Sequence, residues 1–372
     1  MLIGVPAESR PGETRVAATA ETIKKLVAAG HRVVVQSGAG TNAAQTDDAC
    51  RAAGAEIVDA DTALGADIVL KVRLPQADEL ARMKRGATLV GMLEPFNNDG
   101  IAAMNAAGLT AFALEAAPRT TRAQSMDVLS SQANIAGYKA VLLSAATYGR
   151  MMPMLMTAAG TIKAARVLIL GAGVAGLQAI ATAKRLGAVI EASDVRPAVK
   201  EQIESLGAKF VDVPFETDEE REIAKGVGGY ARPMPASWMQ RQSQAVAEKM
   251  KLADIVITTA LIPGRKAPVL ITEDMVRAMK PGSVILDMAV EQGGNCAVSE
   301  AGQTVIRHGV TIIGQPNLPA TVPADASALY ARNLLDFLKL LLTKEGGLSI
   351  NREDDIVAAC LMCANGEITR RN

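Results

Sequence analysis

The stretch that most constrains the fold is residues 166–194, RVLILGAGVAGLQAIATAKRLGAVIEASD. The apolar run 167–170 predicts a buried parallel strand, and a glycine pattern follows it and opens an alanine-rich helix. In that pattern Gly171 allows a tight turn, Gly173 lets the backbone approach a pyrophosphate, and Gly176 lets the helix pack closely on the strand. The sequence therefore predicts the first βαβ unit of a dinucleotide-binding sheet.

The predicted helix begins where a pyrophosphate would bind, because unpaired N–H groups and the helix dipole favour an anion at a helix N terminus. Cofactor contacts are expected from Gly171, Gly173, Val174, Ala175 and Gly176 in this turn, and from Asp194, Val195 and Arg196 after the second strand. The Asp194 carboxylate is placed to accept from a ribose hydroxyl, which favours NAD over NADP. Arg196 keeps an alternative open, since an arginine near this place accommodates a 2′-phosphate.

Composition narrows the class of protein. The 372 residues are enough for two domains, and 49% hydrophobic content suits α/β architecture. Lysine plus arginine and aspartate plus glutamate both number 39, so no bulk basic charge attracts nucleic acid. With only four cysteines, no N-terminal signal pattern and no run of about 18 apolar residues, we expect a cytoplasmic protein without a membrane span.

Strand-like and helical runs alternate along the chain, which predicts mostly parallel sheets covered on both faces. In the first half these runs are residues 2–5, 19–29, 32–36, 47–53, 67–72, 76–84, 88–92, 101–107 and 109–114. In the second half the predicted strands are 167–170, 188–192, 209–211, 255–259, 284–288 and 311–313. Six strands with intervening helices match a complete doubly wound sheet.

Long helices over 128–150 and 325–342 are predicted to join the two halves, the second packing back on the first domain. The expected architecture is two Rossmann-like domains with a cleft between them: residues 1–127 plus 322–372, and residues 128–321. The tail, 346–372, is expected to form short strands. A glycine- and proline-rich loop over about 222–237 is either a functional lid, with Tyr230 as its one large side chain, or an excursion without a role.

A polar segment precedes the first long helix. Arg119, Gln124, Asp127 and Ser130 offer a cation, an amide, a carboxylate and a hydroxyl within twelve residues, enough to hold a carboxamide or a ribose. The alternative is a solvated loop in which Asp127 or Ser130 merely caps the following helix. The residues alone leave both interpretations open.

Few other residues suggest chemistry. Both histidines, His31 and His308, lie at turns entering strands and are expected to be structural. Oxidation of an alcohol or amine by NAD needs a general base, most often histidine, whereas hydride exchange between two nicotinamides needs none. The Cys360-x-x-Cys363 spacing has no second pair, so we expect two buried small residues and no metal site.

Several segments together resemble the NAD(H)-binding component of proton-translocating NAD(P) transhydrogenase. They are residues 119–138, 157–161, the glycine turn, 257–264 and 290–296, so the resemblance covers essentially the whole chain. That family is related to alanine dehydrogenase, whose pattern is echoed in residues 10–17 and in Lys71-Val72.

The resemblance implies roles for particular residues. Arg119, Gln124, Asp127 and Ser130 would hold the nicotinamide and its ribose, Tyr230 would be the mobile-loop tyrosine, and Thr259, Ala260 and Leu261 would add cofactor contacts. Hydride would pass directly from NADH to NADP on a separate component, and a membrane-spanning component would couple that step to proton movement. The chain would be a homodimer, peripheral on the inner face of the cytoplasmic membrane through its partners.

Two alternatives remain. An alanine-dehydrogenase-like amino-acid oxidoreductase would use Arg15 and Lys71 to bind a carboxylate, but the histidine of that enzyme would fall near residues 92–94, where this chain has none. Its acid after the fifth nucleotide-domain strand is Glu291 here. The other alternative is a non-catalytic NAD-binding partner protein.

Overall fold

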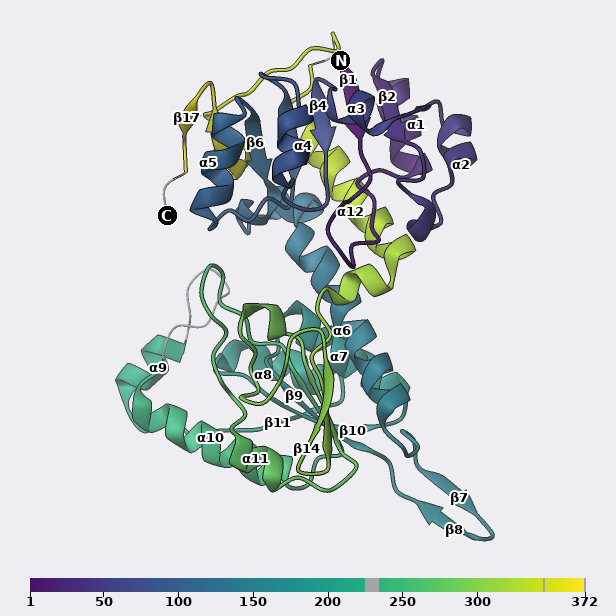
Figure 1. Ribbon diagram of the computed structural model, residues 1–372. Helices are drawn as coiled ribbons and strands as arrows, with labels where there is room; N and C mark the ends of the chain where they lie inside the picture. Colours follow the sequence, from purple (N-terminus) through teal and green to yellow (C-terminus); the bar gives the residue numbers. More distant parts are fainter. Residues whose placement is uncertain (225–233, 344, 371–372) are drawn as a thin grey trace. The chain divides into compact units, whose positions relative to one another are not determined.

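The computed structural model describes residues 1–224, 234–343 and 345–370. The chain divides into two compact units: unit 1 is Met1–Gln132 with Pro319–Asn372, and unit 2 is Ala133–Leu318. The sequence placed the corresponding boundaries at 127/128 and 321/322. Each unit is built on its own sheet (Figure 1).

The sheet of unit 1 has the strand order β17-β16-β6-β5-β4-β1-β2-β3. Its strands are β1 (Leu2–Val5), β2 (Arg32–Gln36), β3 (Glu56–Val58), β4 (Ile68–Leu70), β5 (Thr88–Gly91), β6 (Thr110–Ala113), β16 (Leu361–Ala364) and β17 (Glu367–Ile368). The first six pair in parallel, whereas β16 is antiparallel to β6 and β17 to β16. The carboxyl ends of the six parallel strands therefore meet at one edge.

Helices cover this sheet: α1 (Ala20–Ala28), α2 (Asp47–Ala52), α3 (Ala60–Leu64), α4 (Ala77–Arg82), α5 (Asn98–Ala106), α12 (Pro323–Leu338) and α13 (Asp355–Cys360). Helix α12 packs Tyr330, Leu334 and Phe337 into the same core as Ile3 and Val5, although about 320 residues separate them. The helix that follows unit 2 in sequence thus belongs to unit 1.

The prediction for the tail is wrong in one segment, because residues 355–360 form helix α13 and not a strand. Asp354 starts this helix, since its carboxylate accepts from the backbone N–H groups of Ile356 and Val357. The short elements β3 and α3 were not predicted. A capping residue and an edge strand of three residues leave little periodicity in the sequence.

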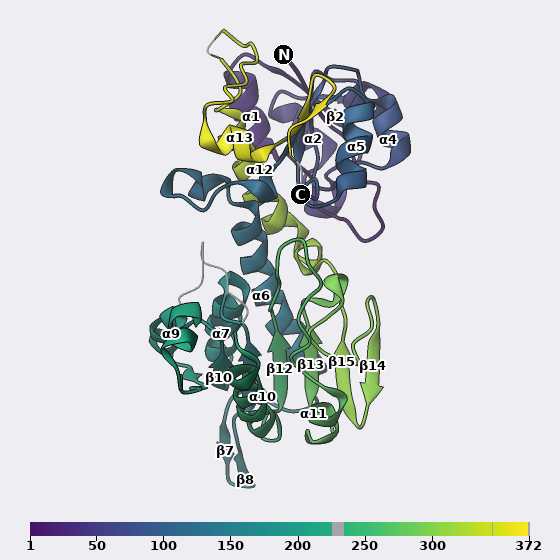
Figure 2. The same cartoon turned by 90° about the vertical axis from the view of Figure 1, so that its left-hand side faces the viewer.

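The sheet of unit 2 has the order β11-β10-β9-β12-β13-β15-β14. Its strands are β9 (Arg166–Leu170), β10 (Val189–Ser193), β11 (Lys209–Phe210), β12 (Ile255–Thr258), β13 (Val284–Asp287), β14 (Thr304–Arg307) and β15 (Val310–Ile313). All neighbours are parallel except β14 and β15. Figure 2 shows β12, β13, β15 and β14 side by side. The chain reverses its winding between β9 and β12, the place where such sheets bind nucleotides.

Both faces of this sheet are buried. Val167 and Ile169 point into a core shared with α6 (Val128–Thr147), α7 (Val174–Arg185) and α8 (Lys200–Ser205). Leu168 and Leu170 point into a second core with α10 (Ala236–Met250) and α11 (Glu273–Arg277). The continuous apolar run in β9 is what burial on both faces requires. The prediction of two mostly parallel, Rossmann-like sheets is confirmed.

Two features of unit 2 differ from the sequence-based prediction. The hairpin of β7 (Leu155–Thr157) and β8 (Gly160–Ile162) was not predicted, and it projects from its unit (Figure 1). The predicted mobile loop over 222–237 is bounded more narrowly, because residues 222–224 end α9 (Asp218–Ala224) and 236–237 begin α10. Tyr230 lies outside the described residues.

Candidate nucleotide site

The turn between β9 and α7 needs glycine at two of its three glycine positions. Gly171 has a φ of 100°, which favours glycine. A Cβ on Gly176 would lie 1.9 Å from the carbonyl oxygen of Gly171, so the helix approaches the strand only without a side chain there. A Cβ on Gly173 would meet nothing within 4 Å, and its φ is −75°. The glycine at 173 is therefore not required by packing and leaves the helix start open to a ligand.

Helix α7 begins at Val174, and no side chain caps it, because the N-cap residue is Gly173. Helix α6 passes close by: a Cβ on Gly137 would lie 2.1 Å from the carbonyl oxygen of Ala175. Val174 and Ala175 thus lie between a buried helix contact on one side and the open turn on the other. Backbone N–H groups at an uncapped helix start suit an anion such as a pyrophosphate.

Asp194 follows β10 and is already engaged within the chain. Its Oδ2 accepts from the N–H of Ala172 (2.8 Å) and from Nη2 of Arg196 (2.8 Å), while Oδ1 accepts from the backbone N–H and Nε of Arg196 (2.8 and 2.9 Å). Its side chain is 6% exposed. The carboxylate therefore fixes the glycine turn, and the pairing raises the pKa of Arg196 further. The sequence did not predict this pairing, which links the predicted NAD acid to the predicted alternative.

A hollow lies beside Asp194. Its lining residues are Asp194, Val195, Pro197, Lys200, Phe210, Asp212, Val213, Phe215 and Trp238. The rings of Phe215 and Trp238 stack with centroids 5.9 Å apart. Asp194 thus stands at the rim of a largely apolar wall.

The loop after β12 meets the glycine turn directly. The hydroxyl of Thr259 donates to the carbonyl oxygen of Gly171 (3.0 Å), and its N–H donates to that of Leu170 (2.8 Å). Ala260 follows, and Leu261 is 43% exposed. The structure therefore brings Thr259 and Ala260 to the same edge of the sheet as Gly171.

Two buried residues that the sequence analysis did not select hold this loop in place. The Asn295 side chain accepts from the N–H of Ala260 (3.0 Å) and donates to the carbonyls of Ala260 (2.9 Å) and Pro268 (2.8 Å). Asp287, at the end of β13, accepts from the backbone N–H of Asn295 (3.1 Å) and from the hydroxyl of Thr258 (3.1 Å). Both side chains are fully buried. The only sequence signal is the Gly-Gly-Asn turn after a predicted strand.

The polar segment belongs to unit 1, where it forms the 3₁₀ helix η3 (Thr121–Met126) and the first turn of α6. A hollow of about 340 Å³ is lined by Pro118, Arg119, Thr120, Thr121, Ala123, Gln124, Asp127 and Ser130. All four polar residues selected from the sequence therefore line one hollow. Arg119 and Gln124 are exposed, and Asp127 and Ser130 are half-buried.

Asp127 also caps helix α6. Its Oδ1 accepts from the N–H of Ser130 (2.9 Å) and its Oδ2 from the hydroxyl of Ser130 (2.6 Å). This capping was one of the two interpretations left open by the sequence, and the structure contains it. Each carboxylate oxygen retains a second lone pair, so capping leaves room for a ligand hydrogen bond.

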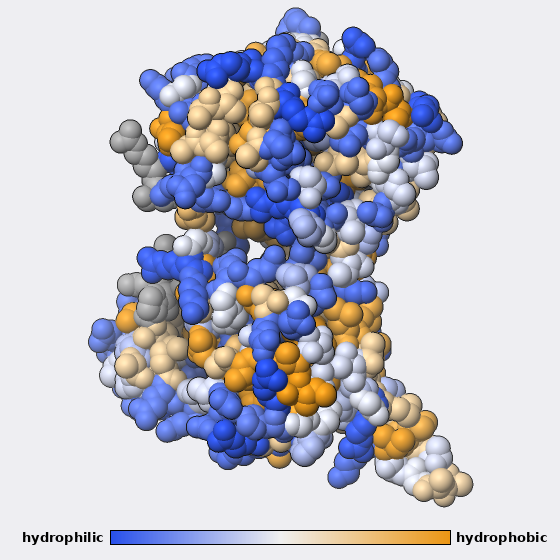
Figure 3. All heavy atoms as spheres, in the orientation of Figure 1, coloured by the Kyte–Doolittle hydropathy of each residue, from blue (hydrophilic) through white to orange (hydrophobic). Residues whose placement is uncertain are grey.

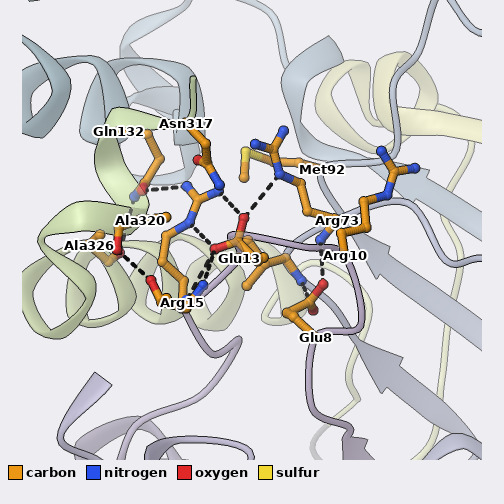
Figure 4. Close-up of polar contacts among 12 residues, drawn as sticks. Glu8, Arg10, Glu13, Arg15, Arg73, Met92, Gln132, Asn317, Ala320 and Ala326 are labelled. Carbon is orange, nitrogen blue, oxygen red and sulfur yellow. Dashed lines mark hydrogen bonds and ion pairs between the residues drawn. The ribbon is translucent and has the colours of Figure 1, made fainter. Parts of the chain in front are cut away.

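A buried ionic network lies at the carboxyl edge of the sheet in unit 1 (Figure 4). Glu13 accepts from Nε and Nη2 of Arg15 (both 2.7 Å) and from Nε of Arg73 (3.0 Å). Nη1 of Arg15 donates to Gln132 (2.8 Å), whose amide donates to the carbonyl of Ala326 (3.1 Å). This chain of contacts ties the first loop to α6 and α12.

Lys71 is the other residue that echoes alanine dehydrogenase. It pairs with Glu79 and with Glu8 (3.5 Å), and it is 1% exposed. Burial raises the pKa of Glu8, while Lys71 and the backbone N–H of Val72 act in the opposite direction. Arg15 and Lys71 are thus both engaged by internal carboxylates.

Within residues 1–224, 234–343 and 345–370, no three His, Cys, Asp or Glu side chains are grouped as metal ligands. No helix in these described ranges is long and apolar enough to cross a membrane. The four cysteines are buried and free, and burial raises the pKa of Cys360 to about 12 and that of Cys363 to about 11. His31 is buried beside β2, and His308 in the β14–β15 turn contacts Glu273 (2.8 Å).

Known proteins match the chain over nearly its whole length. The family model for the N-terminal domain of alanine dehydrogenase/PNT matches residues 4–136, and the model for the C-terminal domain matches residues 140–371. An NAD(P) transhydrogenase subunit alpha of Rhodospirillum rubrum is 51% identical over 99% of this chain and 97% of its own length.

Solved structures agree. A transhydrogenase from Sinorhizobium meliloti superposes with a TM-score of 0.86 at 46% identity, covering 99% of this chain and 98% of its own. An L-alanine dehydrogenase superposes with a TM-score of 0.80 at 28% identity, covering 99% and 96%. The similarity to transhydrogenase is therefore greater in both sequence and structure.

Proposed function

Because this chain belongs to the alanine dehydrogenase/PNT family and its transhydrogenase relatives are the more similar ones, we propose that it is the NAD(H)-binding, hydride-donating subunit of a proton-translocating transhydrogenase. The proposal rests above all on Gly173. Neither packing nor backbone conformation requires glycine there, whereas the approach of a pyrophosphate to the start of α7 does. The residues around it fit NAD(H).

In this proposal the start of α7, from Gly171 to Gly176, holds the pyrophosphate, and Asp194 accepts from the adenosine ribose. Val195 and Arg196 border the adenosine, and Thr259, Ala260 and Leu261 line the path toward the nicotinamide. The negative charge of Asp194 disfavours a 2′-phosphate, because its pairing with Arg196 leaves the arginine turned inward. NAD(H) is therefore the preferred nucleotide.

The reactive end of the nucleotide is assigned to Arg119, Gln124, Asp127 and Ser130. A carboxamide offers both a donor and an acceptor, which Asp127 and Gln124 can match, and the Arg119 guanidinium supplies a fixed cation. NADH supplies the hydride, and NADP⁺ on a partner component receives it. No proton leaves the nicotinamide in such an exchange, so the site needs orientation and exclusion of water more than a general base.

The partners are proposed to be a second copy of the chain, an NADP(H)-binding component and a membrane-spanning component that moves protons. Subunits alpha are what the transhydrogenase relatives are called, which supports an assembly. The β7–β8 hairpin supports the homodimer: it exposes Met154 (61%) and Met156 (71%), and apolar residues are visible on the projecting hairpin in Figure 3. The assembly would hold the chain at the inner face of the cytoplasmic membrane.

The test is a reconstituted assay. The purified chain is mixed with an NADP-binding component, and NADH-dependent reduction of NADP⁺ is followed. We expect turnover that neither protein shows alone, and its absence would refute the proposal. Arg119→Ala and Gln124→Ala should slow single-turnover transfer more than they weaken NADH binding, and unchanged rates in both would remove those residues from the site. Tyr230, proposed to close over the nucleotide, is tested by Tyr230→Phe.

Two other functions are separated by the same preparations. An amino-acid oxidoreductase is favoured by the alanine dehydrogenase similarity, and it predicts that pyruvate plus ammonia oxidises NADH with this chain alone. A non-catalytic NAD-binding protein predicts NADH binding without turnover in either assay. For the dimer, Met156→Glu should shift the mass in sedimentation toward the monomer, with Glu273→Gln as a surface control.

A further inference from the structure

Asn333 on helix α12 touches both ends of the segment that carries the predicted nicotinamide-binding residues. Its Nδ2 donates to the backbone carbonyl of Ser125 (2.7 Å), and its Oδ1 accepts from the hydroxyl of Ser131 (2.7 Å). A carbonyl only accepts, so the amide nitrogen must face Ser125 and the amide oxygen must face Ser131. A single orientation of one side chain satisfies both contacts, and Asn333 is only 7% exposed.

The two contacts bracket the candidate site. Ser125 directly follows Gln124, and Ser131 directly follows Ser130, with Asp127 between them. In this interval the backbone changes from η3 to α6 at Asp127, whose φ and ψ of −74° and 88° belong to neither helix. No regular backbone hydrogen-bond pattern therefore fixes the angle between the two helices, and a side chain from elsewhere does so.

Helix α12 provides a firm base for that side chain. Tyr330, one turn before Asn333, is fully buried; its hydroxyl donates to the carbonyl of Lys71 (2.6 Å) and accepts from the N–H of Met92 (3.1 Å). Leu334 and Phe337 lie in the core of unit 1. The position of Asn333 is therefore tied to the ends of β4 and β5.

Other contacts hold the segment in place without setting this angle. Ala123, Met126 and Val128 are buried in the same core. Arg122 donates to both oxygens of Asp354 (2.6 and 2.9 Å). Removal of the Asn333 amide therefore leaves a folded segment whose polar side chains are less well oriented.

We propose that Asn333 is a positioning residue for hydride transfer, holding Gln124, Asp127 and Ser130 in register without contacting the nucleotide. This inference rests on the proposed function. Transfer between two rings depends on distance and angle more steeply than binding does, and a misplacement of about 1 Å can cost about 100-fold in rate. The effect should therefore appear in the rate of transfer and hardly in the affinity for NADH.

The experiment compares Asn333→Asp, Ser131→Ala and the control Arg332→Ala in the full chain with its NADP-binding partner. Asn333→Asp keeps the acceptor for Ser131 but turns a carboxylate oxygen toward the Ser125 carbonyl, while Ser131→Ala removes only the other contact. Arg332 is the neighbouring residue on α12 and pairs with Glu21 at the surface (2.6 Å). NADH affinity, single-turnover transfer and amide hydrogen exchange over residues 121–131 are measured for each.

We expect Asn333→Asp to slow transfer about 10- to 100-fold with NADH affinity within about threefold of the wild type. Exchange over residues 121–131 should accelerate, and Arg332→Ala should change none of the three. Lowering the pH toward the carboxyl range, about 4 to 5, protonates the new carboxyl and restores a donor toward Ser125, so the deficit relative to wild type should shrink.

The outcomes are distinguishable. A wild-type chain without transhydrogenation overturns the proposed function. An active wild type with Asn333→Asp at an unchanged rate overturns the role of Asn333. Equal losses of affinity and rate, insensitive to pH, overturn it as well, because they mark a residue that only supports the fold.

Discussion

Asp194→Asn tests the cofactor assignment most directly. The amide oxygen of the replacement still accepts from the N–H of Ala172, so the glycine turn is retained, but the charge that holds Arg196 is lost. A hydrogen bond to a charged acceptor contributes about 1.5–3 kcal/mol, so NADH should bind about 10- to 150-fold more weakly. Arg196, once released, is free to meet a 2′-phosphate, and NADPH should bind unchanged or more tightly.

Trp238 supplies the assay. It is the single tryptophan in the sequence and lines the hollow next to Asp194. Its emission overlaps the absorption of reduced nicotinamide, so NADH binding should quench it, and titration gives the affinity of each nucleotide. Glu273→Gln removes the same charge from an exposed site of unit 2 and is the control. An NADH affinity within about threefold of wild type, or equal weakening of NADH and NADPH, would refute the assignment.

The buried groups give three other predictions. Asn295→Asp places a second acceptor against the Ala260 carbonyl and should weaken NADH binding at least about tenfold, measured by the same quenching. Burial raises the pKa of Glu115 from 4.5 to about 7, so the folded form binds its proton more tightly than the unfolded chain, and stability falls as pH rises from about 4.5 to about 7. Glu115→Gln should remove up to about 3 kcal/mol of that dependence, seen in urea midpoints at about pH 5 and pH 8. Cys360 and Cys363 should resist alkylation in the native protein and react after unfolding, as mass spectrometry would show.

What the sequence predicted well is local in origin. The glycine turn, β9 and the start of α7 follow from constraints within eleven residues, 166–176, and the apolar run of β9 reports burial on both faces. The long helix beginning at Val128 was predicted for the same reason, since its pattern spans many turns. Where several consecutive residues carry the same signal, the structure agrees with it.

What the sequence did not show depends on contacts between distant residues. Helix α13 forms because Asp354 caps it and pairs with Arg122, 232 residues away, whereas its own six residues are β-branched and apolar enough to suggest a strand. Arg196 was considered for a 2′-phosphate, but whether it faces outward or pairs with Asp194 is a matter of side-chain geometry. The sequence suggested that the polar segment either grips a ligand or caps a helix, and Asp127 is placed for both.

The two asparagines share a physical logic that explains why irregular segments serve as ligand loops here. A side-chain amide presents a donor and an acceptor in one plane, so it can replace two backbone contacts that a helix or strand would have supplied. Asn295 holds Ala260 by its N–H and its carbonyl together, and Asn333 holds Ser125 and Ser131 on either side of a helix junction. Each amide is carried at the edge of a packed element, so the loops inherit the rigidity of the core while their other polar groups stay open toward solvent. Affinity is thereby governed by residues of unit 2 and orientation by residues of unit 1, which makes the two separable by mutation.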